Sequence, residues 1–320
     1  MKALTFSRFG GPEVLTYTDI PEPVLKPDEI MLKMESIGLN FADVYRRKGN
    51  YHLTGQPPYI AGYEGAGIVA DANHHPDFKI GDRVAFADVP LANAEFVAVP
   101  CTHAIKLPDE ISFDTAASLL LQGLTAQYLA ADSHNVLAGE TVLIHAAAGG
   151  VGQLLTQICK MKGAKVIGLT TSEEKKAIIM EAGADLACNL KADWEKEVLG
   201  YTDGKGADIV YDSVGATLPA SLAVARTGGH VVFYGMSGGD PLPVDPRMLM
   251  DTSKTLSGGD LWSYLTSKEE RTKRAGELFS WIISGKIKLK EPVVFRLSEG
   301  KAAHEYLEGG KSAGKVLMTP

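Results

Sequence analysis

The stretch Thr141-Val-Leu-Ile-His-Ala-Ala-Ala-Gly-Gly-Val-Gly-Gln153 decides the fold of this chain. It starts with an apolar run, Val142–Ala146, that predicts a short buried strand, and continues into a second apolar run, Val151–Met161, that predicts a helix. The residues at the three glycine positions of the dinucleotide-binding pattern are Ala147, Gly149 and Gly152. A tight turn of small residues lets backbone N–H groups approach phosphate oxygens at the positive end of a helix. The stretch therefore predicts binding of a dinucleotide pyrophosphate, with an ordinary strand-to-helix turn as the alternative.

The middle of the chain repeats this alternation of strand-like and helix-like runs. Helical runs are predicted at Val151–Lys162 and Glu173–Glu181. The strand-like runs that follow the glycine turn are Lys165–Leu169, Asp185–Asn189, Ile209–Asp212 and His230–Tyr234. Alternation of this kind predicts parallel strands joined by right-handed crossovers. The fold class predicted for this part is therefore α/β, with a doubly wound parallel sheet.

The first part of the chain, residues 1–115, has a different pattern. Short strand-like runs, among them Ile30–Met34, Gly67–Ala70 and Arg83–Phe86, are separated by turns rich in Gly and Pro. This pattern predicts a β-rich domain ahead of the α/β part.

The last part of the chain, after Gly258, mixes both kinds of element. The predicted helices are Lys268–Ser284 and Ser298–Leu307, and the predicted strands are Val293–Leu297 and Lys315–Met318. Two strands cannot form a stable sheet alone, so we expect them to join the β-rich domain. The predicted domains are residues 1–120 together with 259–320, and residues 121–258.

Charge argues against nucleic acid and membrane as partners. The net charge is −7, from 32 basic and 39 acidic residues, so the chain lacks the basic excess that such surfaces attract. The densest basic cluster is Arg46-Arg47-Lys48, which we interpret as a solvated face, with a phosphate contact as the alternative. The longest apolar stretch, Ala116–Ala131, is too short to span a bilayer.

The N-terminal residues and the cysteines indicate a cytoplasmic protein. Residues Met1–Arg8 are typical of a charged strand and not of a signal peptide. Cys101, Cys159 and Cys188 are scattered and form no Cys-x-x-Cys pair, so neither a disulfide framework nor a zinc ribbon is indicated.

The end of the second predicted strand indicates which dinucleotide is preferred. A site selective for NAD carries Asp or Glu there, to bind the ribose 2′-hydroxyl. This chain instead has Thr170, Thr171 and Ser172. Glu173 and Glu174 are expected in the first turn of the next helix. Lys175 could reach a 2′-phosphate, with a solvated helix lysine as the alternative, so NADPH is favoured.

Five further motifs occur in order along nearly the whole chain. They are Gly38–Tyr45, Pro58–Val69, Leu121–Ala126, Tyr211–Gly215 and Tyr234–Ser237. Together with the glycine turn they resemble the quinone oxidoreductase, or zeta-crystallin-like, subfamily of the zinc-independent medium-chain dehydrogenase/reductase superfamily.

The resemblance implies a GroES-like β-rich catalytic domain, a Rossmann domain and a homodimer. It also implies NADPH-dependent transfer of a hydride to quinones or related electrophilic carbonyl or enone acceptors. It places Asn40 and Tyr45, the two catalytic candidates, at the nicotinamide end of the cofactor. Gly149, from the glycine turn, and Thr171, from the end of the second predicted strand, are added to the positions that the resemblance implies. The cofactor-binding candidates are then Thr125, Gly149, Gly150, Val151, Thr171, Ser172, Lys175, Tyr234 and Ser237.

Three positions depart from the pattern of the wider superfamily. Tyr63 stands where zinc-dependent alcohol dehydrogenases carry a histidine ligand, so no metal is expected. Leu190 replaces a tyrosine that often packs beside the 2′-phosphate. Ser257-Gly-Gly259 aligns with a cofactor-contacting arginine.

Reduction of a quinone or enone places negative charge on an oxygen, which a hydroxyl or amide donor can stabilise. Tyr45 is the candidate donor and Asn40 a second orienting donor. Alternatively, Tyr45 covers the nicotinamide and Asn40 bridges two loops. Two other functions stay open: a reductase of alkenals, enones or enoyl thioesters, and a non-catalytic NADPH-binding protein. His145, at the end of the first strand, is interpreted as a packed residue.

Overall fold

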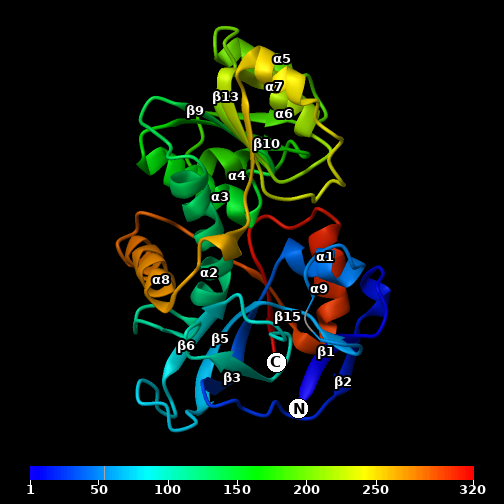
Figure 1. Cartoon of the computed structure of the whole chain (residues 1–320), viewed down its shortest axis with the longest axis vertical. Coiled ribbons are helices and arrows are strands. Elements are labelled where there is room, and N and C mark those ends of the chain that lie inside the picture. Colours follow the sequence, from blue (N-terminus) through cyan, green and yellow to red (C-terminus); the bar gives the residue numbers. More distant parts are fainter. Residues whose placement is uncertain (54) are drawn as a thin grey trace. The chain divides into compact units, whose positions relative to one another are not determined.

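The computed structural model describes residues 1–53 and 55–320 (Figure 1). The chain forms two compact units: Met1–Leu121 together with Leu265–Pro320, which we call unit 1, and Gln122–Tyr264, which we call unit 2. The sequence analysis placed the boundaries after residues 120 and 258. Helix α2 (Phe113–Tyr128) contains the first boundary.

Unit 2 is built on a parallel sheet, as predicted. In the described residues its six strands lie in the order β11-β10-β9-β12-β13-β14. They are β9 (Thr141–Ile144), β10 (Lys165–Thr170), β11 (Leu186–Asn189), β12 (Ala207–Asp212), β13 (Ala225–Phe233) and β14 (Thr255–Gly258). The helices between them are α3 (Gly150–Met161), α4 (Lys176–Glu181), α5 (Trp194–Tyr201), α6 (Leu218–Val224) and α7 (Pro246–Thr252). This is the predicted doubly wound sheet, and its strand order reverses between β9 and β12.

The strands of unit 2 are buried because helices cover both faces of a parallel sheet. Leu143, Ile167 and Val210, from three neighbouring strands, are all fully buried.

Two predicted bounds differ from the structure. Strand β9 ends at Ile144 because Ala146 has a φ of 49°, which no strand contains. Helix α4 starts only at Lys176, so Glu173 and Glu174 precede it.

Unit 1 contains the β-rich domain and the last part of the chain. In the described residues it has a three-stranded sheet, β2-β1-β4, and a seven-stranded sheet, β15-β16-β3-β5-β6-β8 with β7 paired to β3. The strands are β1 (Lys2–Phe6), β2 (Thr16–Asp19), β3 (Glu29–Leu39), β4 (Tyr59–Ile60), β5 (Glu64–Asp71), β6 (Arg83–Ala87), β7 (Phe96–Pro100), β8 (Ile105–Lys106), β15 (Val293–Arg296) and β16 (Val316–Thr319).

The C-terminal strands join the first domain, as the sequence analysis predicted. Strand β16 pairs antiparallel with β3, with Met318 opposite Ile37, and β15 pairs parallel with β16. The helices of unit 1, besides the start of α2, are α1 (Phe41–Lys48), α8 (Lys268–Ile283) and α9 (Gly300–Glu308).

The interpretation of Arg46-Arg47-Lys48 as a solvated face is wrong for its two arginines. Arg46 and Arg47 are both buried, whereas the Lys48 side chain is 48% exposed. Arg47 donates to Gly10 O and contacts His304 Nδ1, and its guanidinium pairs with Glu308. Since α1 and α9 lie against each other (Figure 1), these arginines are part of the interior.

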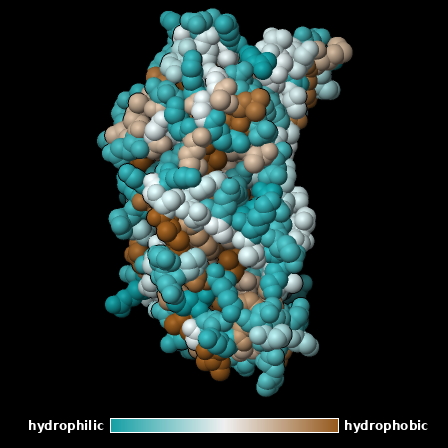
Figure 2. All heavy atoms as spheres, turned by 90° about the vertical axis from the view of Figure 1, so that its left-hand side faces the viewer, coloured by the Kyte–Doolittle hydropathy of each residue, from teal (hydrophilic) through white to brown (hydrophobic). Residues whose placement is uncertain are grey.

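One face of the protein surface shows how its hydrophobic residues are distributed (Figure 2). On the face drawn in Figure 2, hydrophobic residues lie scattered among hydrophilic ones. Patches of this kind are normal on globular proteins and need no special explanation. Within residues 1–53 and 55–320, no helix combines the length and the apolar character needed to cross a membrane.

Candidate functional site

The glycine turn connects β9 to α3 at the carboxyl edge of the sheet in unit 2. His145 and Ala146 follow the strand, and Gly149 is the N-cap of α3. A glycine cap has no side chain that could accept a hydrogen bond from the helix. The first N–H groups of α3, at Gly150 and Val151, can therefore meet an anion at the positive helix end.

Two glycines of this turn lie in crowded places, Gly152 against the turn's own backbone and Gly150 against a side chain of α2. A Cβ atom on Gly152 would lie 2.5 Å from both the carbonyl oxygen of Ala146 and the Cα of Ala147. A Cβ atom on Gly150 would lie 1.8 Å from Oε1 of Gln122. The turn is thus compact enough to bring backbone N–H groups against a pyrophosphate, and it fits the dinucleotide that the sequence predicted.

The hydroxyl groups at the end of β10 lie beside carboxylates. The Ser172 hydroxyl donates to Glu174 over 3.1 Å, while Thr171 is exposed. Glu173 accepts from Asn189 Nδ2 and pairs with Lys176, and these hydrogen bonds lower the pKa of Glu173. Lys175 is the residue before α4. The sequence analysis placed both glutamates in the helix and did not foresee the contact between Ser172 and Glu174.

The candidates Tyr234 and Ser237 follow β13 and are bonded to the end of β12 and the residue after it. The backbone N–H of Tyr234 donates to Asp212 O, and both the N–H and the hydroxyl of Ser237 donate to Ser213 O. Because carboxyl ends of parallel strands share one edge, these residues lie on the same edge as the glycine turn. Thr125 lies on α2 and is 9% exposed.

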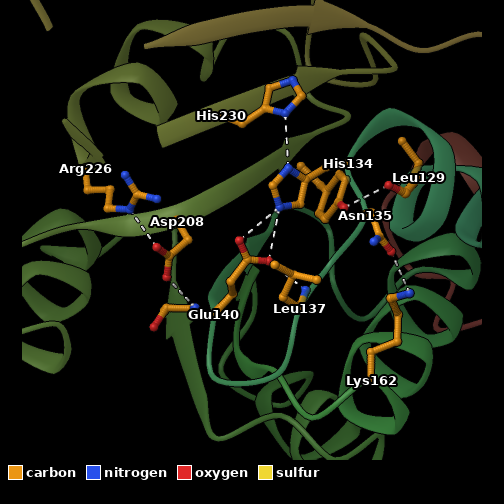
Figure 3. Close-up of polar contacts among 11 residues, drawn as sticks. Leu129, His134, Asn135, Leu137, Glu140, Lys162, Asp208, Arg226 and His230 are labelled. Carbon is orange, nitrogen blue, oxygen red and sulfur yellow. Dashed lines mark hydrogen bonds and ion pairs between the residues drawn. The ribbon is translucent and has the colours of Figure 1, made fainter. Parts of the chain in front are cut away.

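Ser257, the first residue of the stretch Ser257-Gly-Gly259, takes part in a chain of hydrogen bonds that includes two histidines. Its hydroxyl bonds His230 Nε2 at 2.7 Å, and His230 Nδ1 lies 3.3 Å from His134 Nδ1. Figure 3 shows the two rings turned toward each other, with Glu140 on the far nitrogen of His134. Burial and the neighbouring His134 lower the pKa of His230. Ser257 is thus engaged inside unit 2.

In unit 1, Asn40 is the N-cap of α1 and is held on several sides. Its backbone N–H donates to Asp43, which completes a capping box. Its side-chain Nδ2 donates to Glu64 over 2.9 Å, and its Oδ1 accepts from Lys315 Nζ over 2.9 Å. Asn40 is only 5% exposed. Its amide therefore joins β3, β5 and the start of β16.

Glu64 is the centre of this polar cluster and is fully buried. One carboxylate oxygen accepts from the backbone N–H of Leu121, and the other accepts from Asn40 and from Lys315, whose Nζ lies 2.5 Å away. A Cβ atom on Gly38 would lie 2.3 Å from that second oxygen, so a glycine is needed there. The sequence analysis missed Lys315, because a lysine before a strand carries no signal of its distant partner.

A second ion pair of the same cluster lies on α1. Asp43 pairs with Arg46 at 3.2 Å inside the unit, and burial raises the pKa of Asp43. The Arg46 guanidinium lies 3.4 Å from the centre of the Tyr63 ring. Tyr63 is the residue that the sequence analysis placed at the position of the zinc-binding histidine. We call Asn40, Asp43, Arg46, Glu64 and Lys315 the charged cluster.

Tyr45 differs from Asn40 because it is partly exposed. It lies on α1, and its ring contacts those of Phe41 and Tyr51, each with a centroid distance of 6.3 Å. Of the two catalytic candidates, Tyr45 is thus the one whose side chain reaches the surface of unit 1.

A metal site was not expected from the sequence. Over residues 1–53 and 55–320, no three or more His, Cys, Asp or Glu side chains are grouped to hold a metal ion. The three cysteines are buried, and burial raises the pKa of Cys159 and of Cys188 to about 12.

Family models match both parts of the chain. The model of the alcohol dehydrogenase GroES-like domain matches residues 26–141, and that of the zinc-binding dehydrogenases matches residues 150–280.

Individual relatives match over the full length. The quinone oxidoreductase of Pseudomonas aeruginosa is 37% identical over 333 residues, covering 100% of this chain and 99% of that protein. The 2-haloacrylate reductase of a Burkholderia species is 33% identical and covers 99% of this chain and 98% of its own. The crystal structure of Escherichia coli quinone oxidoreductase complexed with NADPH has a TM-score of 0.95 at 35% identity, with 100% of both chains covered.

Proposed function

Because the chain belongs to the quinone oxidoreductase subfamily of the medium-chain dehydrogenase/reductase superfamily, we propose that it transfers a hydride from NADPH to quinones or related electrophilic carbonyl or enone acceptors. The observation that carries the proposal is the glycine turn of unit 2. It lies at the carboxyl edge of the sheet, where strand order reverses and nucleotides bind. The chemistry of hydride transfer is supplied by the cofactor, and the protein binds, orients and shields it.

The proposed cofactor contacts divide into three groups. Gly149, Gly150 and Val151 offer backbone N–H groups to the pyrophosphate. Thr171, Ser172 and Lys175 offer donors to the 2′-phosphate, which requires the exposed Glu174 to release Ser172. The remaining contacts are proposed for Thr125, Tyr234 and Ser237.

We assign different roles to the two catalytic candidates. Tyr45 is partly exposed, so its hydroxyl can donate to the oxygen on which charge develops. The amide of Asn40 is engaged by Glu64 and Lys315, which favours the bridging role over that of a donor to substrate. Asn40 then acts by fixing the start of α1, the helix that carries Tyr45.

We also propose that turnover needs no metal ion. Tyr63 stands where the zinc-dependent dehydrogenases carry a histidine, and its ring is covered by Arg46. Glu64, the next residue, is occupied by the ammonium group of Lys315. A tightly binding chelator should therefore leave the rate of NADPH oxidation unchanged. Stoichiometric zinc in the purified protein, with activity lost on its removal, would contradict this.

The nature of the acceptor divides the proposed function from its nearest alternative. The Burkholderia relative is named a 2-haloacrylate reductase, which supports a conjugated carbonyl acceptor as the second candidate. We further propose a cytoplasmic homodimer. In the described residues, β14 lies at one edge of the unit 2 sheet, and such an edge can pair with a second copy.

A panel of acceptors tests the proposal directly. NADPH oxidation would be followed with a simple quinone, an alkenal, an enone and an enoyl thioester. Fastest turnover with the quinone supports the first candidate, and fastest turnover with a conjugated carbonyl supports the second. Tight NADPH binding without turnover of any acceptor would favour the non-catalytic alternative.

A further inference from the structure

A chain of buried hydrogen bonds joins β9 and β12, the two strands between which the strand order of unit 2 reverses. His145 directly follows β9, and Asp212 is the last residue of β12. Ser221, on α6, lies between them and bonds to both. All three side chains are fully buried, so none of them can touch a substrate. We call these three residues the switch-point triad.

The proton positions in the triad follow from the donors that are present. Asp212 already accepts from the backbone N–H groups of Val214 and Gly215 and from the Thr217 hydroxyl, which identifies it as an ionised acceptor. The single hydroxyl proton of Ser221 therefore goes to Asp212, 2.7 Å away. His145 Nε2, 2.8 Å from the Ser221 oxygen, must then be the protonated nitrogen. Its Nδ1 has no hydrogen-bond partner in the part of the chain that the structure describes.

The triad connects two loops that both reach the nucleotide edge of the sheet. On one side, His145 immediately precedes the glycine turn. On the other side, Asp212 holds the loop that starts at Ser213, and Ser213 O in turn accepts from Ser237. The Ser221 hydroxyl thus provides a side-chain link between the glycine turn and the loops that follow β12 and β13.

The glycine turn needs such support because its backbone is strained. Ala146 has a φ of 49°, in the left-handed region that residues with a Cβ atom avoid. Strain of this kind persists only where the surroundings over-determine the conformation. His145, the residue before it, is held by its backbone N–H on Tyr211 O and by its ring on Ser221.

We propose that Ser221 and His145 are positioning residues for the cofactor. They hold the glycine turn at the separation that NADPH requires from two other loops, the one that starts at Ser213 and the one that contains Ser237. This inference rests on the proposed function, since it assumes that the cofactor binds at this edge. It assigns a role to two residues that never touch the cofactor.

The test compares Ser221→Ala with Ser118→Ala. Ser118, on α2, is also a buried serine, but its hydroxyl has no hydrogen-bond partner among residues 1–53 and 55–320. The dissociation constant of NADPH is measured by fluorescence titration, and kcat is measured at saturating NADPH. Removing the Ser221 hydroxyl should raise the NADPH dissociation constant about tenfold, because two buried partners lose their bond. It should leave kcat nearly unchanged, and Ser118→Ala should change neither.

A second readout uses the protein without cofactor. The amide of Ala147 donates to Leu169 O, and that of Gly149 donates to Ala146 O. In the Ser221→Ala protein both amides should exchange with deuterium faster than in wild type, while those of α8 should not. Equal exchange rates in the turn would overturn the inference.

If Ser221→Ala does not fold, His145→Gln and His145→Leu provide the same comparison. Glutamine keeps an N–H donor for Ser221 and leucine does not, so only the leucine variant should bind NADPH about tenfold more weakly. Equal weakening by both variants would overturn the inference. If folded Ser221→Ala binds NADPH as tightly as wild type does, this inference alone is overturned. Wild type that binds neither NADPH nor NADH overturns the proposed function as well.

Discussion

The charged cluster of unit 1 and the switch-point triad of unit 2 solve the same problem in different ways. Both bury a carboxylate completely, Glu64 in one and Asp212 in the other. Glu64 is neutralised by the cation Lys315, which is far away in the sequence. Asp212 is satisfied by neutral donors from the residues that follow it. Glu64 also has neutral donors, but they cannot replace the charge of Lys315 when it is removed. Asp212 loses only a part of its support when one of its neutral donors is removed.

The largest effect is expected where the cation of unit 1 is removed. Lys315→Met leaves Glu64 buried with no opposite charge beside it, and should cost about 3–5 kcal/mol of stability. Urea denaturation measures this loss. The control is Lys301→Met, since the Lys301 side chain is 55% exposed and its pair with Glu305 is at the surface. If both variants unfold at the same urea concentration, Lys315 does not stabilise unit 1 as the comparison requires.

The second effect concerns Tyr45 on α1, the helix whose start is fixed by Asn40 of the charged cluster. Tyr45→Phe removes the proposed donor and should lower kcat with an enone by up to ~100-fold, with a smaller loss for a reactive quinone. The NADPH dissociation constant should change less than kcat. Tyr306→Phe, in a ring contact with Phe295 elsewhere in unit 1, is the control. An unchanged kcat for both acceptors would reduce Tyr45 to packing.

The third effect concerns acid and tests one buried histidine in each unit. Burial lowers the pKa of His145 to about 4, below the value of roughly 6.5 of an unfolded histidine. Between these values the unfolded chain binds a proton that the folded one does not, so stability falls as pH falls. From about pH 6.5 to about pH 5 the loss should be about 2 kcal/mol, and His145→Gln should remove it.

The matched variant for acid in unit 1 is His304→Gln, because burial and Arg47 lower the pKa of His304 to about 3. Each variant should flatten the pH dependence of stability relative to wild type. If wild type and both variants lose stability in parallel as the pH falls, neither histidine is held neutral.

The smallest effect concerns the hydroxyl end of β10. Lys175→Ala should weaken NADPH about tenfold and leave NADH nearly unchanged, since only NADPH carries the 2′-phosphate. The preference should shrink as salt is added. Lys196→Ala, an exposed lysine on α5, is the control. Titration of both cofactors measures the two affinities. If Lys175→Ala lowers the affinity for NADH as much as that for NADPH, Lys175 does not recognise the 2′-phosphate.

The fold was largely predictable because its signals are local. The glycine turn, the alternation of unit 2 and the return of the last strands to the first domain each depend on short apolar runs and turn residues. The strand predicted as Val142–Ala146 ended early because Ala146 adopts a left-handed conformation, which its residue type does not announce.

The polar interior could not be predicted in the same way, because its signals are pairings. Arg46 and Arg47 look like a solvated face until Asp43, His304 and Glu308 are seen to accept from them. The role of Lys315, the residue before β16, likewise depends on Glu64, which lies far away in the sequence at the start of β5. Sequence patterns indicated where Asn40 and Tyr45 lie along the chain, but only the structure separates the buried amide of Asn40 from the partly exposed side chain of Tyr45.

The place of Lys315 and β16 in the sequence sets an order for folding during synthesis. The whole of unit 2 lies between the early strands of unit 1 and its last ones. A ribosome therefore releases every strand of the parallel sheet before it releases the strand that pairs with β3 and the cation that neutralises Glu64. Domains generally fold as units while they emerge, so the nucleotide-binding unit can complete itself first. Unit 1 has to wait with an open sheet edge and an unpaired carboxylate, which makes it the part of the nascent chain most in need of protection.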